Sequence, residues 1–346
     1  MNKHFAASIA LISSALLCNV AEAQSESAFM APLVKESMLL DVAKANQLVV
    51  VGERGHILSG TPQSLTQVSV PTQVTLTAVD GINDIYIAVG HDATILRSSD
   101  GGKTWTEVFS KVEIDRPFLD VMFLSENEAL AIGGYGLYYR STDAGETWEL
   151  EQDNTSLLSQ DDVDYLESIA DDPEFYQEEL NYIFPHFNRL SKSNGNLFLV
   201  GEAGLIARST DNGRSWERFE IDYYGSFFDV QEIADNQLLA VGLRGNMYLK
   251  DGFDEWERIE TCITTSLNTI VKTELGFYVV GNNGVVLSLD PARLGQDETQ
   301  APNNEGCERH IALTRIPSDI SSSISNAFVA NGELTAVSAN GLQPVE

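Results

Sequence analysis

The chain has 346 residues, of which 51 are acidic and 21 are basic, so its formal net charge at pH 7 is −30. This excess of negative charge argues against nucleic acid and against anionic membrane surfaces as ligands, because both are bound through the neutralisation of phosphates. The simplest interpretation of the charge is high solubility.

Residues 1–23 have the pattern of a secretory signal peptide. Lys3 supplies a positive start, residues 9–17 form a short apolar segment, and Ala21 to Ala23 gives an A-x-A cleavage site. Cys18 lacks the small preceding residues of a lipoprotein signal, and no other stretch could cross a membrane. We therefore expect a periplasmic or secreted protein that does not insert into the membrane and is a monomer. Its net charge after cleavage would still be −30.

The remainder, residues 24–346, is organised by a repeat. A small apolar run followed by Gly-x-x-Gly, with Ala93 in place of the second Gly in the second copy and a degraded last copy, recurs seven times, at residues 51–55, 89–93, 132–136, 200–204, 241–245, 280–284 and 337–341. The spacings are 38, 43, 68, 41, 39 and 57 residues, so four lie near 40 and two contain insertions. A period of about 40 residues with four short strands per unit is typical of a β-propeller blade. We predict an all-β, seven-bladed propeller with four-stranded antiparallel blades.

Alternating apolar residues place the strands of the predicted blades. The innermost strands are expected near residues 38–43, 74–79, 118–124, 227–233, 267–271 and 324–329. In the third blade the other strands are expected at residues 129–132, 136–141 and 148–151.

Three blades share a hairpin of the form Ser-x-Asp-x-Gly-x-Thr/Ser-Trp. The Asp carboxylate can accept hydrogen bonds from the amides of the turn, Gly supplies a positive φ, and Trp adds a large apolar surface to the next strand. We interpret these residues as structural, and they are Ser98, Asp100, Gly102, Trp105, Ser141, Asp143, Gly145, Trp148, Ser209, Asp211, Gly213 and Trp216.

The first insertion, residues 153–188, is acidic. Between residues 149 and 188 there are twelve acidic residues and no Lys or Arg, interleaved with aromatic residues. Residues 161–184 have helical character, and Pro173 is expected to divide them. Two interpretations remain open, namely a docking site for a basic partner and a solvated excursion that covers the blades.

The second insertion, residues 291–306, is polar and is expected to be a loop. Cys262 and Cys307 flank it and are the only cysteines outside the signal peptide. An even number of cysteines in an exported protein predicts one disulfide.

The seventh unit ends after its third strand, so its outer edge needs a partner. Residues 28–34 are apolar and have no place in the repeat. We expect them to form an N-terminal strand that closes the last blade, with Pro32 at the edge of the sheet.

The Asp hairpin resembles the bacterial neuraminidase repeat, or Asp-box, first noted in sialidases. The resemblance implies a structural turn on the periphery of a propeller, and it raises a glycoside hydrolase of sialidase-like type as the alternative function. Sialidases also use three arginines and an early Phe/Tyr-Arg-Ile-Pro segment. The nearest analogue here, residues 315–317, lies near the C-terminus.

The whole chain after residue 23 more closely resembles the seven-bladed photosystem II assembly and stability factors. The residues that carry this resemblance are the segments 51–55 and 241–245 and the hairpins with Trp105, Trp148 and Trp216. The family implies a non-enzymatic scaffold that binds a protein partner and assists assembly of a membrane complex; exported relatives are associated with RND-type transporters. Its members display arginines from loops, which here would be Arg54 and Arg244. We expect no catalytic residue, cofactor or metal site.

Overall fold

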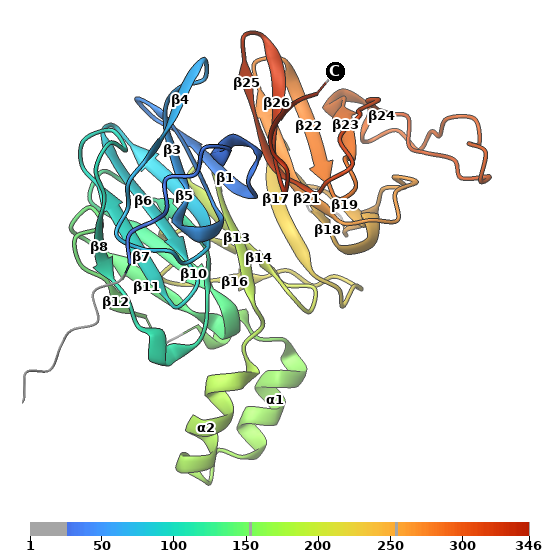
Figure 1. Ribbon diagram of the computed structural model, residues 1–346. Helices are drawn as coiled ribbons and strands as arrows, with labels where there is room; N and C mark the ends of the chain where they lie inside the picture. Colours follow the sequence, from blue (N-terminus) through green and yellow to red (C-terminus); the bar gives the residue numbers. More distant parts are fainter. Residues whose placement is uncertain (1–25, 152–153, 253–254, 346) are drawn as a thin grey trace, which may run out of the picture.

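The chain forms a ring of seven antiparallel sheets arranged around a central axis (Figure 1). The computed structural model describes residues 26–151, 154–252 and 255–345, so the predicted signal peptide lies outside the described residues. Six sheets have four strands and the seventh has three. The predicted seven-bladed propeller is therefore confirmed.

Each blade is a meander in which the first strand lies innermost. The first three blades are β1 (Leu39–Lys44), β2 (Leu48–Gly52), β3 (Ile57–Thr61) and β4 (Ser64–Val68); β5 (Leu76–Ile82), β6 (Ile85–Gly90), β7 (Thr94–Ser98) and β8 (Thr106–Phe109); and β9 (Phe118–Phe123), β10 (Ala129–Gly133), β11 (Tyr138–Ser141) and β12 (Glu149–Leu150). The next two are β13 (Phe187–Ser193), β14 (Asn196–Gly201), β15 (Ile206–Ser209) and β16 (Glu217–Arg218); and β17 (Phe227–Ala234), β18 (Gln237–Gly242), β19 (Met247–Asp251) and β20 (Glu257–Arg258). The last two are β21 (Leu267–Thr273), β22 (Gly276–Gly281), β23 (Val286–Leu289) and β24 (Leu313–Arg315); and β25 (Ile324–Ala330), β26 (Glu333–Ser338) and β27 (Gly341–Pro344).

The core lies between neighbouring blades rather than inside any one of them. Every residue of β2 and of β10 is buried, because a second strand is covered on both faces by adjacent blades. One cluster, for example, joins Leu130 and Tyr138 of the third blade to Leu197 and Trp216 of the fourth. Stability therefore depends on closing the whole ring.

The two faces of the disc differ in the connections that they carry. On one face, here called the loop face, turns between second and third strands contact the connections that lead to the next blade. The amide of Gly55, for example, donates to Val74 O at 2.8 Å, and that of Gly204 donates to Gly225 O at 2.9 Å. A Cβ on Gly204, whose φ is +68°, would collide with the carbonyl oxygen of Tyr223. The Asp hairpins lie on the opposite face, where Gly101 N donates to Asp84 O.

The predicted N-terminal closing strand is wrong. Residues 28–33 are not a strand; they run along the first blade, where Ala28 N donates to Val70 O and Ala31 N donates to the Gln67 side chain. A 3-10 turn, Val34–Glu36, then meets β27 and buries Val34 between the first and seventh blades. Gly341 packs tightly on the Lys35 carbonyl, and the segment does not pair with β27 as a strand.

Direct bonds between the first and seventh blades close the ring instead. Ser325 Oγ donates to Leu39 O at 3.2 Å, and Asn326 Nδ2 donates to Asp41 Oδ1 at 2.7 Å. These bonds join residues 286 and 285 positions apart, so they hold the two ends of the propeller together.

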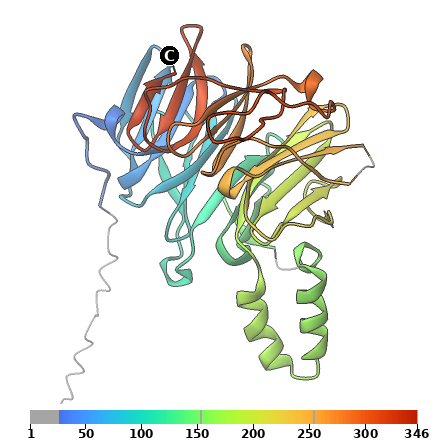
Figure 2. The ribbon, with the colours of Figure 1, turned by 90° about the vertical axis from the view of Figure 1, so that its right-hand side faces the viewer.

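The acidic insertion folds into two antiparallel helices, α1 (Gln160–Ser168) and α2 (Pro173–Ile183). Pro173 is the first residue of α2, so it divides the helical residues as expected. The pair projects away from the blades on the loop face, at the bottom of the view in Figure 2. Among the described residues, no helix has the length and apolar character that a membrane span requires.

Cys262 and Cys307 form the predicted disulfide, with their Cα atoms 5.8 Å apart. It closes a loop of 45 residues, which stabilises the fold by about 4 kcal/mol on the chain-entropy model.

Candidate functional site

The Asp carboxylate of each hairpin is hydrogen-bonded within its own turn. In the first hairpin, Asp100 Oδ1 accepts hydrogen bonds from Ser98 Oγ and from the amides of Lys103 and Thr104, while Oδ2 accepts one from Thr104 Oγ1. Partial desolvation raises the pKa of Asp100, but these hydrogen bonds outweigh it and lower the pKa to about 2. The carboxylate is therefore already satisfied, and we assign it a structural role.

Each Asp hairpin also joins its own blade to the preceding blade. Its tip carbonyl accepts a hydrogen bond from the third strand of the neighbour, in the pairs Ser59 Oγ to Gly101 O, Arg97 Nε to Ala144 O and Arg140 Nη1 to Asn212 O. The three donors occupy the same register position in successive blades. The hairpins thus act as connectors between blades.

Polar side chains of the inner strands form a ring inside the axial channel. Asp41, Asp120 and Asp229 stand at equivalent positions, and each accepts a backbone amide of a neighbouring blade, from Val79, Leu190 and Ile270 respectively. Arg189 occupies the same position in the fourth blade, and its charge interacts with all three carboxyl groups. Burial raises the pKa of Asp120 to about 7 and that of Asp229 to about 6.

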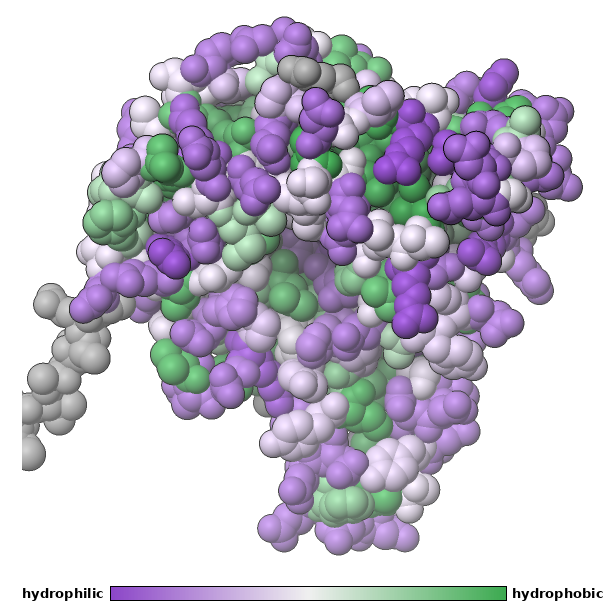
Figure 3. Space-filling view, turned by 45° about the vertical axis from the view of Figure 1, so that its right-hand side comes forward, coloured by the Kyte–Doolittle hydropathy of each residue, from purple (hydrophilic) through white to green (hydrophobic). Residues whose placement is uncertain are grey.

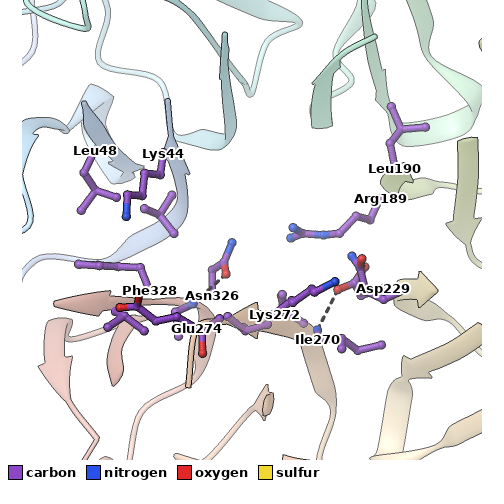
Figure 4. Close-up of a pocket in the computed structure, with 17 residues that line it drawn as sticks. Lys44, Leu48, Arg189, Leu190, Asp229, Ile270, Lys272, Glu274, Asn326 and Phe328 are labelled. Atoms are coloured by element: carbon purple, nitrogen blue, oxygen red, sulfur yellow. Dashed lines mark hydrogen bonds between the residues drawn. The ribbon is translucent and has the colours of Figure 1, made fainter. Parts of the chain in front are cut away.

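One end of the channel opens into a cavity of about 530 Å³. Arg189 and Asn326 extend into this space from different blades, and Lys44, Lys272 and Glu274 lie at its border (Figure 4). Acidic and basic groups are mixed, and the carboxyl groups deeper in the channel already accept backbone amides. Arg189 is the single arginine among the described residues that line this cavity, so a three-arginine carboxylate site of the sialidase kind is not built here.

The structure places the two predicted partner-binding arginines on the loop face but does not bring them together. Arg54 lies in the first blade and Arg244 in the fifth, each at the tip of the turn between second and third strands. Both are exposed; Arg54 Nε lies 3.9 Å from Glu53 Oε2, with 78% of its side chain exposed.

These arginines occupy a backbone conformation that long side chains disfavour. Their φ angles are 54° and 58°, and Tyr135 of the third blade has φ 50° at the same position, whereas the sixth blade uses Asn283 there. Left-handed backbone costs a residue with a side chain about 1–2 kcal/mol, a cost that is commonly retained at binding sites. Asp92 and Ala203 have φ 55° and 52° at the same position in the second and fourth blades, so the left-handed backbone is a property of this turn in the repeat.

Exposed apolar side chains gather on the same face. Within the described residues, nine of the eleven large apolar side chains that are exposed lie on the loop face, on the N-terminal segment that leads into it or on the helical pair, namely Phe29, Met30, Leu33, Val112, Tyr135, Tyr165, Phe175, Tyr182 and Tyr224. The apolar surface on the helical pair stands out among hydrophilic residues in Figure 3. Contiguous exposed apolar surface is typical of interaction sites, so this region is the candidate site.

A hollow of about 450 Å³ lies where the helices join the third blade. Arg116 Nη1 donates to Tyr135 O at 3.2 Å and Arg116 Nη2 donates to Asn181 O at 2.8 Å, while the guanidinium lies over the rings of Tyr135 and Tyr182. Sequence reasoning missed Arg116 and Tyr135. The Tyr135 position could have been found, because it stands in the same Gly-x-x-Gly turn as Arg54.

One group of potential metal ligands is close enough among the described residues, and it consists of Glu260, Cys262 and Cys307. Both sulfur atoms belong to the disulfide, so neither is a thiolate that could bind a metal.

Comparisons with known proteins agree with the repeat and the fold. A family described as BNR/Asp-box repeat matches residues 139–150, which contain the second Asp hairpin. The chain is 25% identical over 191 residues to the photosystem II assembly lipoprotein Ycf48 of a Synechococcus species, covering 49% of this chain and 56% of that protein. Against the protein of the same name from Prochlorococcus marinus, 25% identity extends over 167 residues, covering 42% of this chain and 48% of that protein. The chain thus spans about half the length of the curated relatives it matches.

Among solved structures, "YCF48 bound to D1 peptide" superposes with a TM-score of 0.61 at 13% identity, covering 92% of this chain and 94% of that one. Ycf48 from Cyanidioschyzon merolae gives a TM-score of 0.60 over 92% of this chain and 98% of that one, also at 13% identity. At this identity the likeness concerns the fold. Together the comparisons confirm the resemblance to photosystem II assembly factors and to the Asp-box repeat.

Proposed function

We propose that this chain is an exported, non-catalytic scaffold that binds a segment of a protein partner on its loop face. The partner would be a subunit of a membrane or envelope complex, such as an RND-type transporter assembly, whose assembly or operation the scaffold assists. The carrying observation is the concentration of exposed apolar side chains on the loop face, on the N-terminal segment that leads into it and on the helical pair; Arg54 and Arg244 lie on the same face.

The composition of this face supports protein recognition. Tyrosine and arginine are enriched among the residues that contribute most to protein–protein binding. Arg54 and Arg244 could each hold a partner carboxylate or carbonyl through paired N–H groups, in a chain whose surface is otherwise strongly acidic. The related protein that was solved bound to a D1 peptide gives an example of peptide binding by this fold.

The hydrogen bonds that the candidate catalytic carboxylates already accept support a non-catalytic role. Asp100 and its equivalents are saturated by hydrogen bonds within their turns, and Asp120 and Asp229 accept backbone amides between blades. These carboxyl groups are committed to holding the ring together.

The test is capture of partners from detergent-solubilised envelope, with the captured proteins identified by mass spectrometry. The Arg54→Ala/Arg244→Ala variant is expected to recover about ten-fold less of the main partner than the unmodified chain, which corresponds to a loss of about 1.4 kcal/mol. Lys103→Ala/Arg293→Ala is the matched control, since it removes two exposed positive charges outside the loop face. Equal capture by both variants, or turnover of a fluorogenic sialoside by the purified chain, would overturn the proposal.

A further inference from the structure

The helical pair leaves large parts of several apolar side chains exposed. No residue of α2 is buried, and Leu166 is the one buried residue of α1. On α2, 40% of Phe175 and 68% of Tyr182 are exposed. Helices of nine and eleven residues are marginal by themselves and depend on packing of an apolar face. The pair therefore resembles a three-helix bundle from which one helix is missing.

Anchors at both ends hold the pair in a fixed orientation. Ser159 and Asp172 cap the two helices by accepting the amides of Asp162 and Phe175. Tyr165 Oη donates to Glu179 Oε2 at 2.9 Å and so ties α1 to α2. At the base, Arg116 holds the end of α2 through Asn181 O, and Arg218 Nη1 donates to Leu157 O at 2.6 Å just ahead of α1. A binding surface built this way loses little entropy when it is occupied.

A groove of about 480 Å³ runs between the two helices. Its lining is mainly apolar and includes Val163, Leu166, Ala170, Pro173 and Tyr176. The α1-side lining extends from Val163 to Ala170, about 10 Å at 1.5 Å per residue, so the groove matches a helix of about two turns. Apolar residues at every third or fourth position of such a helix would face the groove.

The charge around the groove restricts what can fill it. Residues 160–183 contain nine acidic residues and no Lys, Arg or His. An acidic segment would be repelled, and so would a second copy of this chain, whose net charge is −30. The complementary occupant has a basic polar face around an apolar stripe.

We propose that α1 and α2 form a docking platform that is completed by a basic amphipathic helix of about two turns, contributed by a protein partner. This inference rests on the proposed function only in assuming that a protein partner exists. It concerns a surface separate from Arg54 and Arg244, so the two can fail independently.

The test uses synthetic peptides and the full chain, and needs no identified partner. The first probe is a labelled peptide of about 14 residues with Leu at positions i, i+3, i+4 and i+7 and Lys elsewhere; the second has the same composition in an order that disperses the leucines. Fluorescence anisotropy is expected to show binding of the amphipathic peptide at least about ten-fold tighter than that of the dispersed one. A third peptide, with Glu in place of Lys, is expected not to bind.

Two variants separate groove binding from general attraction to an acidic protein. Val163→Asp and Ala170→Glu each place a charge in the groove, and each should weaken binding of the amphipathic peptide about ten-fold although the chain becomes more acidic. Val112→Asp is the matched control on an exposed apolar residue outside the groove, and should leave binding unchanged. Circular dichroism of each variant checks that the helices persist; Ala170 lies in an exposed turn, so its replacement spares the helices.

Equal binding of the amphipathic and dispersed peptides would overturn the inference, because it would show attraction by charge alone. Unchanged binding to a folded Ala170→Glu chain would overturn it as well. Neither result would bear on the arginine test of the loop face.

Discussion

Arg140 and Arg208 each precede the serine of an Asp hairpin, so they occupy the same position of the repeat. Their replacement by alanine should nevertheless lower the free energy of unfolding by different amounts. The Arg140 side chain is 7% exposed and makes 2.8 Å ion pairs with Glu128 and Glu151, as well as a hydrogen bond to Asn212 O in the next blade. The Arg208 side chain is 39% exposed and pairs with Glu217, which is 64% exposed.

The expected loss in the free energy of unfolding follows from these surroundings. Removing one partner of a buried ion pair costs about 3–5 kcal/mol, because the other charge is left without compensation. Glu128 would keep its 2.7 Å contact with Arg214, and Glu151 is partly exposed, so we expect the lower end of this range, about 3 kcal/mol, for Arg140→Ala. For Arg208→Ala we expect about 1 kcal/mol or less, since exposed pairs contribute little.

Urea unfolding followed by tryptophan fluorescence measures both variants, because Trp148 and Trp216 are buried in the hairpins concerned. The difference between the variants should persist when the salt concentration is raised, since screening acts mainly on exposed charges. Equal losses for Arg140→Ala and Arg208→Ala would refute the reasoning that burial, and not motif position, sets the contribution of these arginines.

Two further predictions concern the channel and the closure of the ring. Burial raises the pKa of Asp120 to about 7, and the pKa values of Asp229 and of Asp80, which lies in β5, to about 6. These groups therefore contribute stability that is complete below pH 4 and is lost as the pH rises through 6 to 7. The urea midpoint should therefore be higher at pH 5 than at pH 8, and Asp120→Asn should narrow that difference; an unchanged difference would contradict the assignment. Val34→Ala should lower the free energy of unfolding by about 1–3 kcal/mol because Val34 is buried between the first and last blades, whereas Leu33→Ala, at a 64% exposed neighbour, should change it by less than about 0.5 kcal/mol. Comparable effects of these two substitutions in thermal unfolding would show that the N-terminal segment does not secure the ring.

The local periodicity predicts most of the fold. Gly-x-x-Gly turns and alternating strands recur at a spacing that one blade requires, so seven copies define the ring before any coordinate is known. The division of the acidic insertion at Pro173 is equally local, since proline is favoured at the start of a helix and disfavoured inside one.

The candidate site was harder to predict, because the order of the blades decides which residues share a face and which are neighbours. Arg54 and Arg244 can be found from their turns, but Arg116 lies in a connection without a motif and acts through Tyr135 and Asn181. The closing strand was mispredicted for a related reason. Residues 28–34 have the apolar composition of an edge strand. The same composition also suits an irregular segment that packs against two blades, which is what the structure shows.

The sequence by itself determined the number of blades, the hairpin chemistry and the acidic character of the helical pair, because each depends on residues close together in the chain. The tertiary structure alone decided how the ring closes, which of two equivalent arginines is buried and which face carries the exposed apolar side chains. These properties depend on contacts between residues up to 286 positions apart. The sequence of one repeat does not show which side chains of the neighbouring blade will contact it.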